Sequence, residues 1–489
     1  MTRWSTIETG TLGHPGATVI FASLTPGVFH TPAALRARVE DAARSASFPG
    51  TSRQWLDVLP AQLADDRLLI VSLGHDHEED RWRSAGGYLV AAMRALDLAS
   101  VRLPASTELG IGSDLASLLE GAMLHGFQLD QERRQPNPGV CDRRILVSGA
   151  DTALVERATL RARAINRARA WVEQPANKLT PAIFAAEAEQ ALAAQGVVVH
   201  VLGRPELEQL GAHGLLAVAA GSQHDPRLLV AEWRGDANRP GWDAALVGKG
   251  VTFDGGGLNL KARPIIEKMK FDMAGAAAVL AALELAATRQ CRANVVAVVP
   301  MTENTIDGKA YRPGDVISSL AGLTIEVINT DAEGRIILAD AITYAIDHYD
   351  PTYLVDVATL TGLITGVLHE EYAAIYANDD TLADGLIRAG SDSHEELWRM
   401  PLSAKQDYLV ESAIADVVNY GPSGYLGFAP GSPVAAAKFL ERFASARRWA
   451  HIDIAGTAWA SRRTSRSGPG ATGFGASLLD RWLTSLEKD

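Results

Sequence analysis

The strongest constraint on the fold is an alternation of short apolar runs with helix-like stretches, which fills the chain from about residue 176 onward. The apolar runs predict strands: VVVHVL (197–202), RLLVAEW (227–233), AALVGKGVTF (244–253), ANVVAVVP (293–300), LTIEVI (323–328), YLVDVATL (353–360) and AHIDIAG (450–456). Helices are predicted between them at 274–290, 333–349 and 432–444. Strands that are apolar on both faces and separated by helices are typical of a parallel sheet covered on both sides. We therefore predict an α/β fold here, with a mixed, mostly parallel sheet flanked by helices.

The first 150 residues carry a shorter version of the same pattern. Strands are predicted at TVIFAS (18–23), RLLIVSL (67–73) and RILVSG (144–149), with helical stretches between them. This indicates a smaller N-terminal α/β domain. An arginine-rich helix is predicted from about Asp151 to Glu173, and Gln174-Pro175 ends it. The chain of 489 residues is too long for one ordinary domain. We divide it into an N-terminal domain (1–150), a linker helix (151–175) and a large C-terminal domain (176–489).

Charge and cysteine content narrow the classes of function. The net charge of −12 argues against broad binding to nucleic acid, although the arginines of the 151–173 helix leave a nucleic-acid face as an alternative to a solvated or subunit-contacting one. Only two cysteines occur, Cys141 and Cys291, which suits a reducing compartment. The first residues lack the apolar core of a signal peptide, and we find no run of the ~18 apolar residues that a membrane span needs. We expect a soluble cytoplasmic protein with no membrane partner.

Four acidic residues lie where such a sheet would present ligands. Asp254 ends the 244–253 strand, and Asp331 and Glu333 follow the 323–328 strand within the run NTDAEGR. Asp272 directly precedes the alanine-rich 274–290 helix. Ligands of open α/β sheets bind beyond the carboxyl ends of the strands, so these acids converge on one crevice if the strands are neighbours. Helix capping is the alternative for Asp331 and Glu333, because a helix N-terminus favours acids.

Lysines accompany these acids. The chain has nine lysines, and four of them fall between residues 249 and 270. Carboxylates crowded in a dry crevice must protonate, pair with cations or bind metal, and oxygen-rich sites suit Mg, Mn or Zn. Two metals could share bridging carboxylates and stabilise a hydrolytic transition state. A neutral lysine amine could complete one metal site, and a charged lysine could polarise a carbonyl. Hydrolysis of phosphoesters is disfavoured, because no phosphate-binding loop surrounds Lys249.

These segments resemble the successive blocks of the leucyl (cytosolic) aminopeptidase family. The blocks run from Lys249 to Trp459 in family order: VGKGVTFDGGGLNLK, MKFDMAGAAAV, ENTIDGKAYRPGDV, NTDAEGRIILAD, VDVATLTG and HIDIAGTAW. NTDAEGR is similar to the family's signature. WVEQPANKLTPAIFA resembles the start of the catalytic domain, which would make 176–489 a di-metal aminopeptidase domain. The first 150 residues match weakly, as a macro-like domain in the expected place.

The resemblance implies a role for each site residue. Lys249, as a neutral amine, and Asp272 would bind the tighter of two divalent metals, and Asp331 the looser one. Asp254 and Glu333 would bridge the two. Lys261 would polarise the scissile carbonyl, and Arg335 would hold a bicarbonate that acts as general base. The residues expected to line the substrate are Met269, Asn329, Thr359, Leu360 and Gly362.

The implied reaction is removal of the N-terminal residue from peptides with a free amino terminus. A hydroxide bridging the metals would attack the carbonyl, and the metals would be Mn or Zn, with Mg or Co as alternatives. The family implies a homohexamer. A nucleic-acid-binding regulator on the same scaffold is the alternative function. Gly255 stands where the family commonly has serine, and Gly431-Ser432-Pro433 also departs from its pattern, so a leucine preference is not predicted.

Overall fold

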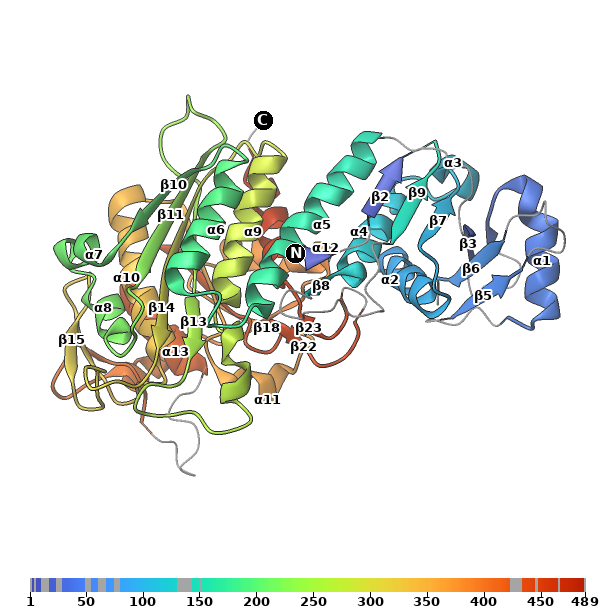
Figure 1. The fold of residues 1–489 in the computed structure, drawn as a ribbon. Helices are drawn as coiled ribbons and strands as arrows, with labels where there is room; N and C mark the ends of the chain where they lie inside the picture. The colour runs from blue at the N-terminus through green and yellow to red at the C-terminus, as the bar shows by residue number, and fades with distance from the viewer. Residues whose placement is uncertain are drawn as a thin grey trace. The chain divides into compact units, whose positions relative to one another are not determined.

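The computed structural model describes residues 2–3, 6–9, 17–22, 29–48, 54–59, 67–73, 80–129, 143–149, 152–422, 433–444, 447–464 and 467–487. The chain forms two compact units (Figure 1), which are Met1–Asn166 with Ala460–Gly470, and Arg167–Trp459 with Ala471–Asp489. The division falls inside helix α5 (Thr152–Glu173) rather than at its ends. It also assigns Ala460–Gly470 to the first unit, although this segment lies near the end of the chain. No local sequence pattern predicts this assignment.

The first unit is built around a seven-stranded sheet. Its order is β2 (Thr6–Thr9), β9 (Arg144–Val147), β7 (Ser100–Leu103), β3 (Thr18–Ala22), β6 (Leu68–Ser72) and β5 (Trp55–Val58), with β4 (Phe29–His30) beside β3. All pairings are parallel except those of β4 and β5. The helices are α1 (Arg36–Ser45), α2 (Arg81–Ala95), α3 (Ser106–Leu109) and α4 (Asp114–Gly126), with η1 (Ala33–Leu35). A two-residue pair joins β1 (Thr2–Arg3) to β8 (Gln128–Leu129).

The second unit holds a nine-stranded sheet that is mixed and mostly parallel, as predicted. Its order is β10 (Val198–Leu202), β11 (Arg227–Arg234), β14 (Asn294–Asn304), β12 (Ala244–Gly248), β17 (Tyr353–Ala358), β21 (Arg448–Asp453), β18 (Ala373–Ala377) and β19 (Leu397–Arg399), with β13 (Gly250–Asp254) beside β14. Only the β10–β11, β11–β14 and β18–β21 pairings of this sheet are antiparallel. The predicted 244–253 strand is two strands, β12 and β13, with Lys249 between them.

Helices flank this sheet as expected (Figure 1). One group consists of α6 (Pro181–Ala193), α9 (Ala274–Thr288), α12 (Asp380–Ser393) and α14 (Ala476–Ser485). The other group consists of α8 (His213–Ala219), α10 (Glu333–Tyr349) and α13 (Pro433–Phe443), whose apolar faces share one core with the sheet. The remaining elements are α7 (Arg204–Leu210), α11 (Thr365–Leu368), η2 (Ile266–Phe271), η3 (Gly362–Ile364), η4 (Ala404–Val410), β15 (Val316–Ser318), β16 (Thr324–Glu326), β20 (Val417–Val418), β22 (Trp459–Ala460) and β23 (Gly470–Ala471).

The prediction that LTIEVI forms a buried strand of the main sheet is wrong. The segment gives only the three-residue strand β16, which pairs with β15 and β20 in a separate small sheet. Ile325 is buried there, whereas Thr324 bonds Asp416 and Glu326 accepts from Ser412. That alternation is typical of a strand with one polar face rather than of a strand buried on both faces. Asp331 therefore reaches the site from the loop before α10, and Glu333 from the first residue of α10.

The length and apolar character of one stretch were underestimated from the sequence. By length and composition alone, Ile266–Thr288 is long and apolar enough to cross a membrane. In the structure 89% of an 18-residue window within it is buried inside the protein, and α9 packs against strands β12 and β17. The stretch is thus accounted for as a core helix.

The arginines of α5 are largely engaged within their own units. Arg161 lies 3.3 Å from a carboxylate oxygen of Glu120, and Arg167 donates to Glu284 across 3.1 Å. Arg169 is buried and donates to the carbonyl of Ala471. Arg157 and Arg163 remain exposed. This pattern favours a structural and solvated face over a nucleic-acid face.

Candidate active site

A pocket of about 360 Å³ lies in the second unit, beyond the carboxyl ends of β13 and β17. Nine of the twelve predicted site residues line it: Lys249, Asp254, Lys261, Met269, Asp272, Asp331, Thr359, Leu360 and Gly362. They come from separate places in the chain, including the β12–β13 junction, the loop after β13, η2 and the loop after β17. The structure thus brings together segments more than 100 residues apart.

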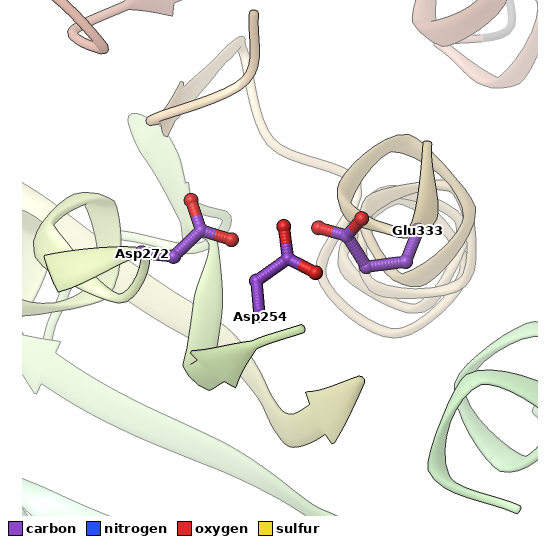
Figure 2. Close-up of side chains that lie close together, drawn as sticks. All are labelled: Asp254, Asp272 and Glu333. Carbon is purple, nitrogen blue, oxygen red and sulfur yellow. The ribbon is translucent and has the colours of Figure 1, made fainter. Parts of the chain in front are cut away.

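Three buried carboxylates meet at the centre of the site. Asp254 ends β13, Asp272 follows η2, and Glu333 begins α10. Each contributes an oxygen, and these oxygens all lie within 4.8 Å of one another. Figure 2 shows Asp254 between the other two, with the carboxylates directed toward a common space. Burial of three adjacent carboxylates disfavours their charged forms unless cations compensate them.

Two lysines supply that compensation. Lys249 Nζ lies 2.7 Å from Asp272 Oδ2 and 2.9 Å from Glu333 Oε1. Lys261 Nζ lies 2.9 Å from Asp254 Oδ2 and 2.5 Å from Asp331 Oδ1. Burial lowers the pKa of Lys249, but the surrounding carboxylates raise it by more, and the same holds for Lys261. Both lysines are therefore ammonium ions in this arrangement.

The pKa values of two of the acids are also raised. Burial, followed by the charges of Asp254 and Glu333, raises the pKa of Asp331 to about 7, with Lys261 opposing the shift. Burial is also the largest cause of the raised pKa of Asp272. Two ammonium groups do not fully neutralise four carboxylates. The cluster therefore retains an affinity for further positive charge.

The donor set fits divalent metal ions. Asp272 Oδ2, Asp331 Oδ1 and Glu333 Oε1 are buried, yet none accepts a hydrogen bond of ordinary geometry from the described residues. A lysine Nζ is nearby in each case, as an ion pair only. Hard carboxylate oxygens are the ligands that Mn and Mg prefer, and Zn accepts them too. The four acids are numerous enough to serve two ions.

Asn304 is a site residue that the sequence reasoning missed. It ends β14 and pairs in register with Asp254 on the neighbouring strand β13. Its Nδ2 donates to Asp254 Oδ1 across 2.9 Å and to the carbonyl of Thr330 across 3.0 Å. The amide therefore fixes one acid from the sheet and the loop that carries Asp331. A polar residue at the carboxyl end of an apolar strand was the available signal.

Asp453 is a second missed residue, at the end of β21. Its Oδ1 accepts from the backbone N–H of Leu360 at 3.1 Å, and its Oδ2 accepts from the Thr361 hydroxyl at 2.5 Å. Thr359 Oγ1 in turn donates to Asp272 Oδ1 across 2.7 Å. Asp453 thus positions the loop that forms one wall of the pocket. The segment HIDIAG carried the same signal, an acid where a buried strand ends.

Three predicted residues do not line the pocket. Glu333 is buried in the carboxylate cluster. Arg335 is buried, and its NH1 donates to the carbonyl of Asn419 at 2.7 Å, whereas its Nε has no hydrogen bond among the described residues. Burial lowers the pKa of Arg335 to about 10, with Glu333 opposing. Asn329 accepts from the Asp331 N–H at 2.8 Å, so it shapes the loop rather than the pocket surface.

Gly255, one of the positions that depart from the family pattern, directly follows β13. A Cβ at Gly255 would lie 3.1 Å from the Asn304 carbonyl oxygen, so a larger residue would press on the β14 end. Gly431 and Ser432 lie outside the described residues, as does Cys141, while Pro433 begins α13. Cys291 is a buried free thiol.

The family model of the cytosol aminopeptidase catalytic domain matches residues 166–479, which cover the whole site. The chain belongs to the cytosol aminopeptidase family. It is a leucyl-aminopeptidase-type hydrolase, and both the family and the enzyme class predicted from the sequence are confirmed. This membership follows from more than the site alone, because similarity to relatives extends over nearly the full chain.

Two sequence relatives and two solved structures illustrate that similarity. Probable cytosol aminopeptidases from Sinorhizobium fredii and Wolbachia pipientis are 38% and 37% identical, covering 90% and 85% of this chain and 89% and 83% of their own. The bottromycin maturation enzyme BotP in complex with Mn superposes with a TM-score of 0.83 at 32% identity, covering 97% of this chain and all of its own. A tomato leucine aminopeptidase variant gives 0.84 at 27%, covering 99% of both chains.

Proposed function

We propose that this family member removes the N-terminal residue from peptides at a site that holds two divalent metals. The observation that carries the proposal is the meeting of Asp254, Asp272 and Glu333 within 4.8 Å in a buried cluster. Asp331 and two lysines adjoin that cluster, and an open pocket lies beside it. Burying like charges lowers the stability of the fold. Metal binding therefore explains this cluster better than a structural role does.

Each ligand has a proposed place. Lys249, as a neutral amine that releases its proton when the ion binds, and Asp272 would hold the tighter ion. Asp331 would hold the looser one, and Asp254 with Glu333 would bridge the two. When bound, such ions polarise a carbonyl and generate a strong nucleophile from water at neutral pH. The structural similarity to a protein solved with Mn supports Mn as the first metal to test, ahead of Zn, Mg and Co.

The chain's own groups would then bind and orient the peptide. Lys261 Nζ lies at the pocket and can donate a hydrogen bond to the carbonyl oxygen of the scissile bond, where negative charge develops. Met269, Thr359, Leu360 and Gly362 would contact the substrate, and Asn329 would hold the Asp331 loop. Arg335, whose Nε has no hydrogen bond within the described part of the chain, would hold bicarbonate as the general base.

The proposal also covers the substrates, the assembly and the cellular location of the enzyme. Peptides with a free amino terminus are the proposed substrates, and a homohexamer is the proposed assembly. The relatives are named cytosol aminopeptidases, which supports a cytoplasmic location. The arginine contacts of α5 give no support to a role as a nucleic-acid-binding regulator.

Metal removal and carboxylate substitution test the proposal. Protein stripped with a chelator should lose hydrolysis of amino-acid amides, and Mn should restore it. Asp254→Asn and Glu333→Gln should each lower kcat/KM by about 1,000-fold or more, because several kcal/mol of transition-state stabilisation depend on the metals. Asp384→Asn, at an exposed position of α12, is the matched control. Full activity of stripped protein in metal-free buffer would refute the proposal.

A further inference from the structure

The short helix η2 (Ile266–Phe271) forms one wall of the active-site pocket. Met269 and Phe271 line the pocket from this wall, and Pro264 and Ile265 extend the apolar surface before it. Lys268 lines the same pocket but is exposed, unlike the buried Met269 beside it. A lysine stem can lie along such an apolar surface while its ammonium group stays in water. The wall thus presents an exposed positive charge beside the pocket.

The lysines that line the pocket differ in whether they form ion pairs with carboxylates. Three lysines line it, and Lys249 and Lys261 each lie within 2.9 Å of two carboxylates. Lys268 forms no ion pair with any carboxylate of the described residues. Its neighbour Lys270 is used elsewhere, since its Nζ donates to the Glu173 carbonyl at 2.5 Å and lies 5.8 Å from the Trp459 ring.

We infer that Lys268 makes this enzyme prefer peptides that carry a carboxylate close to the bond being cut. The inference rests on the proposed aminopeptidase function and names its substrate class. An unpaired cation beside low-dielectric walls attracts anions into a cleft. The carboxylate has three sources with the same chemistry: an acidic N-terminal side chain, an acidic second side chain, or the free C-terminus of a dipeptide.

Three matched substrate pairs separate these sources. Glutamyl is compared with glutaminyl p-nitroanilide, Leu-Glu amide with Leu-Gln amide, and the dipeptide Leu-Gly with Leu-Gly amide. For each pair, the ratio of kcat/KM for the anionic to the neutral substrate is measured on the Mn-loaded full chain. Wild type, Lys268→Met and Lys268→Glu are compared, and Lys405→Glu, at an exposed lysine of η4 outside the pocket, is the control.

One pair should respond to Lys268 and thereby identify the source. An exposed ion pair contributes up to ~1 kcal/mol, so Lys268→Met should lower that ratio by about 2- to 5-fold. Lys268→Glu adds repulsion and should lower it by about 4- to 25-fold, while Lys405→Glu leaves it unchanged. The wild-type ratio should also fall as NaCl is raised from 0.05 to 0.5 M, because salt screens exposed charges.

Two negative outcomes are distinguishable. If the neutral substrates are cleaved but all three ratios are the same in wild type and Lys268→Glu, the inference about Lys268 is overturned and the proposed function stands. If wild type cleaves none of the six substrates with Mn, the proposed function fails and this inference fails with it.

Discussion

At the scale of the residue, the positive charge of Lys249 compensates buried carboxylates in the metal-free site. It is buried and touches two carboxylates that have few other compensating partners. Removing one member of a buried ion pair leaves uncompensated charge and typically costs about 3–5 kcal/mol. We therefore expect Lys249→Met to lower the free energy of unfolding of metal-free protein by that amount, measured by urea denaturation.

Bound metal should reduce the loss of stability caused by Lys249→Met. Mn would bring positive charge to the same carboxylates, so saturating Mn should recover part of the stability that Lys249→Met removes. Lys405→Met, at an exposed lysine, should change the free energy of unfolding by less than about 0.5 kcal/mol with or without metal. Equal losses in the two variants would show that Lys249 is not holding the acids together.

The residues of the site were predictable to different degrees. Asp254, Asp272, Asp331 and Glu333 could be grouped from the sequence because each lies at or near the end of a predicted strand or the start of a predicted helix, with lysines near two of them. The family resemblance then assigned their roles. Asn304 and Asp453 were missed because a single polar residue at a strand end is common. Their importance depends on register, with Asn304 opposite Asp254 and Asp453 beside the loop after β17, and a local pattern does not encode register.

At the scale of the element, helices were predicted more accurately than strand partners. The 274–290 and 333–349 predictions agree with α9 and α10 to within two residues, because long apolar periods define helices. LTIEVI was assigned to the wrong sheet, since a short run with one polar face looks similar in either place. Pairing is decided by neighbours that are far away in the chain, and β16 pairs with β20 almost 100 residues later.

Close packing of α9 on β17 gives the element-scale prediction. A Cβ at Gly275 would lie 2.1 Å from the Val357 carbonyl oxygen, so Gly275→Ala must push the helix from the strand. We expect a loss of about 1–3 kcal/mol in the free energy of unfolding, measured by urea denaturation. Gly366→Ala in α11, where a Cβ meets nothing within 4 Å, is the control and should cause no loss. A Gly275→Ala protein as stable as this control would mean that α9 can move away without cost.

At the scale of the whole molecule, the chain has separate hydrophobic cores in its two units. One core contains Val19, Leu89 and Leu118, and the other contains Val247, Ile337 and Phe439. All proposed metal ligands belong to the second unit. A ligand that binds only the folded state stabilises the part that folds around it, by about 2.7 kcal/mol at 100 times its Kd. Bound metal should therefore stabilise the second unit against unfolding and leave the stability of the first unit unchanged.

Hydrogen exchange can measure that distinction residue by residue. With Mn at 100 times its Kd, amides of α9 and α10 that exchange only through unfolding of their unit should slow by about 100-fold, while those of α2 and α4 keep their rates. Asp254→Asn, which lacks one bridging ligand, should show a much smaller change in α9 and α10. Equal slowing in all four helices would mean that the units unfold as one body. No slowing in α9 and α10 would contradict metal binding at the carboxylate cluster.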